Sequence, residues 1–152
     1  MTDKFDLDVG STMGVSISSK NLVIEGFKIN VQIWDMIGDE LFRPLLTNYA
    51  RGAFGGIFMY DITRKETLLN IDTWFSLFQN KLVEWRGQIP ILIVGGKSDL
   101  TIERKTNLEE ASNLSKSYNI LDNIECSAKT GENIEKLFMT LIIKIMKRSK
   151  FI

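Results

Sequence analysis

VQIWDMIGDE, residues 31–40, joins a β-strand pattern to an acidic turn. The prediction of the fold starts from this stretch. Apolar and polar side chains alternate over residues 29–33, which is typical of a strand with one buried face. The alternation stops at Trp34, and Gly38 follows Asp35 three residues later. A carboxylate at a strand end can hold a hydrated Mg²⁺ ion, and a glycine N–H can approach a phosphate without interference from a Cβ. Because many strand exits contain an acidic turn, this stretch alone does not decide the function.

The composition is that of an ordinary globular protein. With 152 residues, of which 44% are hydrophobic and 25% charged, we expect residues 1–152 to form one domain. Residues 1–11 show no periodic pattern and are expected to form a flexible end. Basic and acidic residues both number 19, so net charge provides no attraction for nucleic acid, and no nucleic-acid partner is expected. The absence of histidine excludes histidine triads and imidazole metal ligands.

The sequence predicts a cytoplasmic protein. Its one cysteine, Cys126, fits a reducing compartment, and no apolar run reaches membrane-spanning length. The final residues, Lys147–Ile152, contain no cysteine for prenylation, so no lipid anchor is expected. This basic run could touch an anionic membrane weakly and place the protein at its periphery. A solvated helix end, with cations at the negative end of the helix dipole, is the favoured explanation.

Hydrophobic patterns predict strands that alternate with helices. The expected strands span residues 15–24, 27–34, 54–61, 89–94 and 123–126. The first two should form an antiparallel hairpin around Glu25-Gly26. Helices are expected over residues 41–50 and 68–82, after a capping box formed by Thr106 and Glu109, and along the apolar stripe of residues 134–145. This alternation indicates an α/β fold, with a three-layer, mostly parallel sheet covered by helices on both faces.

Four polar clusters lie next to the predicted strands. They are Ser11–Val15, Asp35–Glu40, Gly95–Leu100 and Glu125–Lys129. Ligands of such sheets bind beyond the carboxyl ends of the strands, which is where three of these clusters fall. Each cluster has an ordinary structural explanation, such as an acidic turn or a serine helix cap. Their order and spacing together are much harder to obtain by chance.

On these residues the chain resembles the Ras superfamily of small GTPases, and most nearly its Rab branch. IWDMIGDE is similar to the IWDTAGQE segment of that branch, TMGV to its switch I, GGKSDL to its guanine-reading NKxD motif, and ECSAKTG to its SAK loop. The resemblance covers about residues 5–147. It implies a small G-domain with the fold of the P-loop NTPases, and a GTP-binding switch of the kind used in signalling and vesicle trafficking.

The resemblance implies a metal and phosphate site at the switch-like segments. Thr12 would ligate Mg²⁺ and close on the γ-phosphate of GTP, and Asp35 would hold the same ion through water. The Gly38 N–H would contact the γ-phosphate. Asp39 stands where the family usually has the glutamine that orients the attacking water, so Asp39 is the candidate catalytic residue.

The resemblance also implies a guanine site, for GTP or GDP, made from two loops. Asp99 would accept two hydrogen bonds from the guanine edge, which rejects adenine. The Lys97 stem would pack on the base, and the Ala128 N–H would meet the guanine oxygen. Three further residues of these loops complete the candidate nucleotide-binding set: Gly96, Ser127 and Lys129.

Three departures from the family pattern weaken the expected activity. The family begins with a strand and a phosphate-binding loop, G-x-x-x-x-G-K-S/T, whereas only residues 1–11 precede the switch-like segment TMGV. We therefore expect the first strand and the P-loop to be missing. Asp39 is shorter and more negative than the usual glutamine, and Gly96 replaces the asparagine of NKxD, which braces its loop. Together these departures predict weak nucleotide binding and little or no hydrolysis.

Three interpretations remain open from the sequence. The first is a Rab-like molecular switch that binds GTP, hydrolyses it weakly or not at all, and presents a switch-like surface to effector or regulator proteins. The second is a nucleotide-independent pseudo-GTPase, a binding module or adaptor with Trp34, Phe42 and Tyr49 as candidate anchors. The third is a fragment of a longer product that carries the missing strand and loop.

The missing strand has a structural consequence for the expected sheet. It leaves two inner strand edges whose backbone N–H and C=O groups need partners. These edges could close on each other, or another chain could fill the slot between them. A chain that supplies a strand is therefore among the expected partners.

Overall fold

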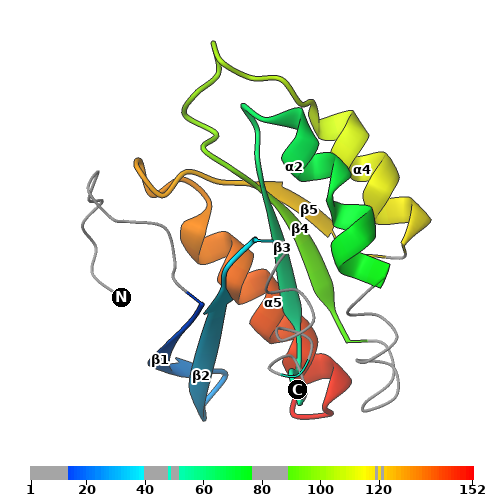
Figure 1. Ribbon diagram of the computed structural model, residues 1–152. Coiled ribbons are helices and arrows are strands. Elements are labelled where there is room, and N and C mark those ends of the chain that lie inside the picture. Colours follow the sequence, from blue (N-terminus) through cyan, green and yellow to red (C-terminus); the bar gives the residue numbers. More distant parts are fainter. Residues whose placement is uncertain (1–13, 40–47, 49–51, 77–88, 119, 121) are drawn as a thin grey trace. The chain divides into compact units, whose positions relative to one another are not determined.

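The computed structural model describes residues 14–39, 48, 52–76, 89–118, 120 and 122–152 (Figure 1). The chain separates into two compact units, Met1–Tyr49 and Ala50–Ile152, and each is described by itself. The predicted flexible end at residues 1–11 and the predicted helix at residues 41–50 lie outside the described residues, apart from residue 48. The prediction of a single domain stays a prediction.

The first unit contains the predicted antiparallel hairpin. It consists of β1 (Val15–Ile24) and β2 (Phe27–Met36). The turn residues Glu25 and Gly26 have φ angles of 49° and 82°. Two successive positive φ angles match the twist of the paired strands, and glycine adopts the second without steric cost. The hairpin and its two-residue turn are therefore confirmed.

The second strand of the hairpin is longer than its side-chain alternation predicts. The predicted strand ends at Trp34, but in the structure Asp35 and Met36 continue the ladder. They pair with Ser16 and Val15 of β1. Backbone pairing with β1, rather than the apolar pattern of β2, sets the end of the strand. Asp35 consequently lies within the strand and not after it.

The second unit contains a parallel three-stranded sheet with the order β3-β4-β5. The strands are β3 (Gly56–Asp61), β4 (Ile91–Gly96) and β5 (Asp122–Glu125). Every residue of β4 is buried, which agrees with its continuous apolar sequence. Pro90 precedes β4 and has no N–H to contribute to the ladder, so β4 begins two residues later than predicted. β3 also begins two residues later than predicted. Its pairing with the neighbouring segment starts at Gly56, whose N–H donates to the Pro90 carbonyl at 3.0 Å.

Helices cover both faces of this sheet (Figure 1). They are α2 (Lys65–Leu69), α4 (Leu108–Ser117) and α5 (Ile134–Arg148). Leu92 and Val94 pack toward α5, whereas Ile91 and Ile93 pack toward α2 and α4. Burying each of these side chains stabilises the fold by about 1.5–3 kcal/mol. The three layers confirm the predicted α/β class for this unit.

The helix α4 is capped one residue later than predicted. The Asn107 side chain accepts from the Glu110 N–H at 2.7 Å, and the Glu110 carboxylate accepts from the Asn107 N–H at 3.3 Å. Thr106, the predicted cap, is instead buried, and its hydroxyl lies 3.3 Å from the Ile62 carbonyl. The sequence contains the capping motif in two registers, and burial of Thr106 selects the second. Leu108, the first residue of α4, is exposed.

The other two helices partly match their predicted ranges. α2 begins at Lys65, and after a turn at Asn70 the chain is again helical over residues 71–76. The rest of the predicted helix over residues 68–82 lies outside the described residues. α5 buries its apolar stripe as predicted. None of the helices in the described ranges is long and apolar enough to cross a membrane.

Candidate functional site

Three polar segments meet at the carboxyl ends of the parallel strands in the second unit (Figure 1). Asp61 ends β3 and pairs with Gly96 at the end of β4. The loop after β4, residues 97–100, and the turn after β5, residues 126–132, leave the sheet beside each other because β4 and β5 are paired in parallel. This is the edge at which parallel sheets bind their ligands.

Ser127 fixes both the 126–132 turn and the predicted guanine-binding carboxylate. Its fully buried hydroxyl donates to Asp99 Oδ1 at 2.5 Å and accepts from the Thr130 N–H at 3.1 Å. Its N–H donates to the Glu132 carbonyl at 3.1 Å, and its carbonyl accepts from the Gly131 N–H at 2.9 Å. A carboxylate has about four acceptor positions, so Asp99 retains capacity to accept from a ligand.

Ser98 ties the 97–100 loop to the 126–132 turn a second time. Its hydroxyl donates to Glu132 Oε2 at 2.7 Å, and its N–H donates to the Cys126 carbonyl at 3.0 Å. The Cys126 N–H donates to the Gly95 carbonyl at 2.8 Å. Burial raises the pKa of the Cys126 thiol, which packs as a small apolar group beneath α5. The two loops are thus joined through both side chains and backbone.

Lys97 is anchored on the end of the neighbouring strand. Its ammonium nitrogen lies 2.8 Å from Asp61 Oδ2, and its φ angle of 67° is unusual for a lysine. Asp61 is only 7% exposed, and its Oδ1 accepts from the N–H and hydroxyl of Thr63 at 2.9 and 2.7 Å. Burial raises the pKa of Asp61, but the hydrogen bonds from Lys97 and Thr63 outweigh it and lower the pKa to about 2.

Ala128 and Lys129, the remaining predicted members of this loop, follow Ser127 and are exposed. Gly96 is buried at the end of β4. A Cβ at Gly96 would lie 3.3 Å from the Met59 methyl carbon and 3.5 Å from the Tyr60 carbonyl oxygen. The structure therefore brings the predicted base-binding residues together, and the backbone around Gly96 leaves room for a side chain if Met59 moves slightly.

The residues predicted for metal and phosphate belong to the first unit. Asp35 in β2 and the following Gly38 and Asp39 are exposed, and Thr12 lies outside the described residues. The Ile37 N–H donates to the Gly14 carbonyl at 2.9 Å and extends the hairpin beyond its last ladder pair. The described residues contain no cluster of three or more acidic or cysteine side chains that could hold a metal ion by themselves. Magnesium usually relies on substrate phosphates, so the predicted Mg²⁺ site would depend on the nucleotide.

Comparison with known proteins identifies the family. A sequence model of the Ras family matches residues 1–147. The chain belongs to the Ras family. Ras-related protein RABC2a of Arabidopsis thaliana is 38% identical over 141 residues, which cover 92% of this chain and 66% of that protein. GTP-binding protein ypt3 of Schizosaccharomyces pombe is 34% identical over 145 residues, which cover 95% of this chain and 66% of that protein.

The similarity to RABC2a, whose name is that of a Rab protein, confirms the predicted resemblance to the Rab branch. The family match also confirms the predicted small G-domain fold class. The chain spans just under two thirds of the length of the first of these relatives. Its activity and its partners are therefore matters for proposal and test.

Sequence reasoning missed two residues that shape this end of the Ras-family sheet. Asp61 carries the same signal as Asp35, a carboxylate at the end of a predicted strand, but the resemblance assigns a role only to Asp35. Glu125 forms a two-pronged ion pair with Arg104, at 2.6 and 2.8 Å. This pair raises the pKa of Arg104 and holds the segment before α4 against the end of β5. No local pattern predicts it.

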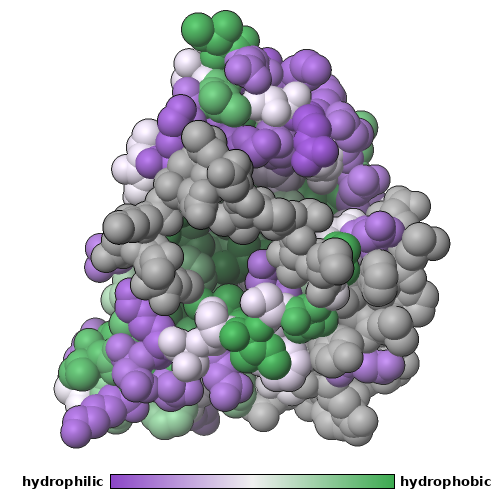
Figure 2. All heavy atoms as spheres, turned by 60° about the vertical axis from the view of Figure 1, so that its left-hand side comes forward, coloured by the Kyte–Doolittle hydropathy of each residue, from purple (hydrophilic) through white to green (hydrophobic). Residues whose placement is uncertain are grey.

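The surface at this end of the Ras-family chain is polar. Figure 2 shows hydrophilic side chains gathered over its upper part, with a few strongly hydrophobic side chains among them. Ile102, 99% exposed, lies in the segment between β4 and α4. The described surface at the strand ends thus suits a polar ligand held by hydrogen bonds rather than an apolar one.

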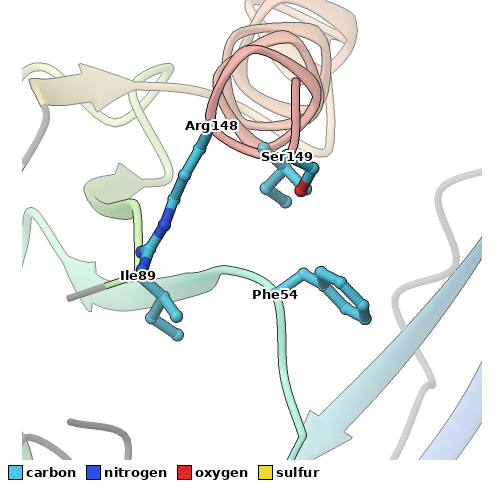
Figure 3. Close-up of a pocket in the computed structure, with 5 residues that line it drawn as sticks. Phe54, Ile89, Arg148 and Ser149 are labelled. Carbon is cyan, nitrogen blue, oxygen red and sulfur yellow. The ribbon is translucent and has the colours of Figure 1, made fainter. Parts of the chain in front are cut away.

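A shallow pocket of about 180 Å³ lies at the opposite end of the same sheet (Figure 3). It is lined by Phe54, Ile89, Ile145, Arg148 and Ser149. Phe54 and Ile89 precede β3 and β4, and Arg148 and Ser149 end α5, so the pocket belongs to the amino ends of the strands. It shares no residue with the 97–100 loop or the 126–132 turn.

Proposed function

We propose that this chain binds guanine nucleotides through the 97–100 loop and the 126–132 turn, as a Rab-like small GTP-binding switch. One observation carries the proposal: Asp99 and Ser127, 28 residues apart, are joined by a 2.5 Å hydrogen bond that orients the Asp99 carboxylate. Two carboxylate oxygens match the two adjacent N–H donors on the guanine edge, which adenine lacks. Family membership supports the proposal, and the relative ypt3 is named a GTP-binding protein.

The described residues would divide the recognition of the base between them. Asp99 would accept from guanine, the N–H of the exposed residue Ala128 would donate to the guanine oxygen, and the Lys97 stem would lie along the ring. Charge-assisted hydrogen bonds of the Asp99 kind contribute about 1.5–3 kcal/mol each. Adenine would leave the acceptors of Asp99 without donors, and each buried acceptor left unpaired costs a free energy of similar size. The site should therefore discriminate against adenine.

The phosphates would depend on a different set of groups. Asp35 and Thr12 could complete the coordination of a Mg²⁺ ion held mainly by the nucleotide, which would neutralise phosphate charge. Asp39 would place a further negative charge near the γ-phosphate, where stabilisation requires positive or neutral groups. The 152 residues contain no G-x-x-x-x-G-K-S/T segment to cradle the phosphates. We therefore propose that hydrolysis of GTP by this chain is weak or lost.

A second candidate function is a nucleotide-independent binding module. Its support is the cross-strand pair Ile17 and Trp34 of the hairpin, which are 57% and 41% exposed. Exposed aromatic side chains beside β-branched ones are typical anchors for a protein partner. Phe42 and Tyr49, the other predicted anchors, lie outside the described residues. In this function the hairpin would bind an effector or regulator whether or not nucleotide is present.

Calorimetric titration of the purified chain with GDP in the presence of Mg²⁺ tests the first function. We expect saturable binding of GDP and at least tenfold weaker binding of ADP. Asp99→Ala should abolish the preference for GDP, whereas Glu109→Gln, an exposed change on α4, should leave it intact. An absence of heat at millimolar GDP, or equal affinity for ADP, would reject the switch and leave the binding module as the surviving function.

A further inference from the structure

Three consecutive residues of the 97–100 loop are each held by a side chain outside the loop, from the end of β3 or from the 126–132 turn. Lys97 pairs with Asp61 at the end of β3, at 2.8 Å. Ser98 donates to Glu132, before α5, and Asp99 accepts from Ser127, after β5. Gly96, which precedes the loop, has no side chain to brace it. The geometry of the predicted guanine site therefore depends on these outside anchors.

Among these anchors, Asp61 is the most firmly held carboxylate, and the sequence analysis gave it no role. Its carboxylate is 7% exposed and is itself immobilised, with Thr63 on one oxygen and the Arg64 Nε, at 3.2 Å, on the other. Its own N–H donates to the Thr67 hydroxyl at 2.9 Å. A carboxylate fixed by this many donors provides a rigid acceptor for one more cation. That cation is Lys97.

Lys97 has the properties of a residue that needs such a holder. It is 57% exposed, and lysine has a long side chain with many accessible rotamers. Its positive φ is a conformation that costs a non-glycine residue of the order of 1 kcal/mol and persists only when its surroundings maintain it. Anchoring the ammonium group on Asp61 fixes the far end of the stem and limits the positions of the stem and its backbone.

We propose that Asp61 is a positioning residue, which holds Lys97 and through it the 97–100 loop in the arrangement that receives the guanine base. The inference rests on the proposed guanine-nucleotide function and deepens it. Asp61 contacts no base in this arrangement, because its carboxylate is occupied by Thr63, Arg64 and Lys97. Its contribution to binding passes through Lys97.

A double-mutant cycle with Asp61→Asn and Lys97→Gln tests this dependence. Asp61→Asn keeps the shape and loses the charge, and we expect it to weaken GDP binding about fivefold, the size of one partly exposed ion pair. In the Lys97→Gln background the same change should have no further effect. The inference would be overturned if Asp61→Asn reduced GDP affinity equally in the wild-type and Lys97→Gln backgrounds, or reduced it in neither.

Glu125→Gln is the matched control. Glu125 is also a partly buried carboxylate at a strand end, and it also pairs with a cation, Arg104, but it contacts neither Lys97 nor Asp61 among the described hydrogen bonds. We expect Glu125→Gln to lower the melting temperature and to leave GDP affinity within twofold. A fivefold loss in the control would show that any weakening of the strand ends is sufficient, and would reject a specific role for Asp61.

Amide hydrogen exchange of the nucleotide-free chain separates the inference from the proposed function. We expect Asp61→Asn and Lys97→Gln to speed exchange of the Ser98 and Leu100 amides several-fold, and the double variant to add nothing. If wild type binds no GDP, the proposed function fails and this measurement alone decides the role of Asp61. Unchanged exchange would overturn the inference. If Asp61→Asn does not fold, Lys97→Arg should retain slow exchange and Lys97→Gln should lose it, and equal exchange in these two would overturn it.

Discussion

The end of the parallel sheet holds the residues predicted to bind the base, the end of the hairpin holds residues predicted for metal and phosphate, and the two ends are built differently. At the sheet end, Ser98 and Ser127 are buried, and their hydroxyls hold Glu132 and Asp99. At the hairpin end, Asp35, Gly38 and Asp39 are exposed. Side chains held in place before a ligand arrives lose less entropy on binding. The residues predicted to bind the base are therefore preorganised through Ser127 and Glu132, whereas those predicted for metal and phosphate are exposed, and their Mg²⁺ would be held mainly by the nucleotide.

The largest effect expected from this comparison is the contrast between Asp99→Ala and Asp35→Ala. Asp99→Ala should weaken GDP binding at least about 30-fold, because it removes two charge-assisted hydrogen bonds. Asp35→Ala should weaken GDP binding less than about threefold, because Mg²⁺ would rely mainly on the nucleotide phosphates. Calorimetry in Mg²⁺ measures both. A larger loss of GDP affinity in the Asp35 variant than in the Asp99 variant would contradict this account of the two ends.

The two glycines at the end of β4 should differ in their tolerance of a side chain. A Cβ at Gly95 would lie 2.8 Å from the ring carbon and the hydroxyl oxygen of Tyr60, and 3.1 Å from the Glu125 Cγ. Gly95→Ala should therefore lower the free energy of unfolding by about 1–3 kcal/mol through overpacking. At Gly96 the nearest atom is the flexible end of the 61%-exposed Met59. Gly96→Ala should therefore change the free energy of unfolding by less than about 0.5 kcal/mol. Denaturant unfolding measures both, and equal losses would contradict this account of the strand end.

Asp61 should give the sheet end a pH dependence on the acid side. Its pKa in the folded chain is about 2, against an ordinary 3.8, so its stabilising contribution is complete above about pH 5 and is lost as the pH falls through 4 toward 2. The contribution should be about 1–2 kcal/mol, reduced because Lys97 is partly exposed. The difference in unfolding free energy between wild type and Asp61→Asn should shrink over this range. A difference that stays constant from pH 5 to pH 2 would show that the carboxylate is not held as described.

The smallest expected effect is a gain in GDP affinity from a substitution at Gly96. Gly96→Asn restores the asparagine that the resemblance assigns to this position, and a Cβ there requires only a small shift of the Met59 methyl group. One added hydrogen bond contributes about 0.5–1.5 kcal/mol, so GDP affinity should rise about two- to tenfold. Gly96→Ala, which adds a Cβ without an amide, is the control. A gain shared by both variants would point to loop stiffening instead.

Much of the base-binding half could be predicted because it follows from topology. Parallel strands end at one edge, so Asp99 and Ser127 had to meet once their strands were recognised. The Asp61–Lys97 pair could not be predicted, because it joins the end of β3 to the loop after β4 and depends on the register of the two strands. The cap of α4 was misplaced because two registers of one motif are locally equivalent, and burial of Thr106 decides between them.

Strand ends were the least predictable part of the fold. Side-chain alternation indicates which residues face a core, but a strand continues for as long as its neighbour offers backbone partners. Asp35 therefore lies inside β2, opposite Ser16. The same principle shortens β4, which begins only after Pro90, and β3, whose Gly56 N–H finds its first partner in the Pro90 carbonyl.

The central claim is that the loops after β4 and β5 recognise guanine with a preformed surface. The most direct test is a two-dimensional ¹H–¹⁵N spectrum of the labelled chain, titrated in parallel with GDP and ADP. The account predicts that GDP shifts the amides of residues 97–100 and 127–130 in a saturable manner and that ADP shifts them at least tenfold more weakly. Equal responses to the two nucleotides, or shifts confined to the pocket around Phe54 and Ile89, would contradict it.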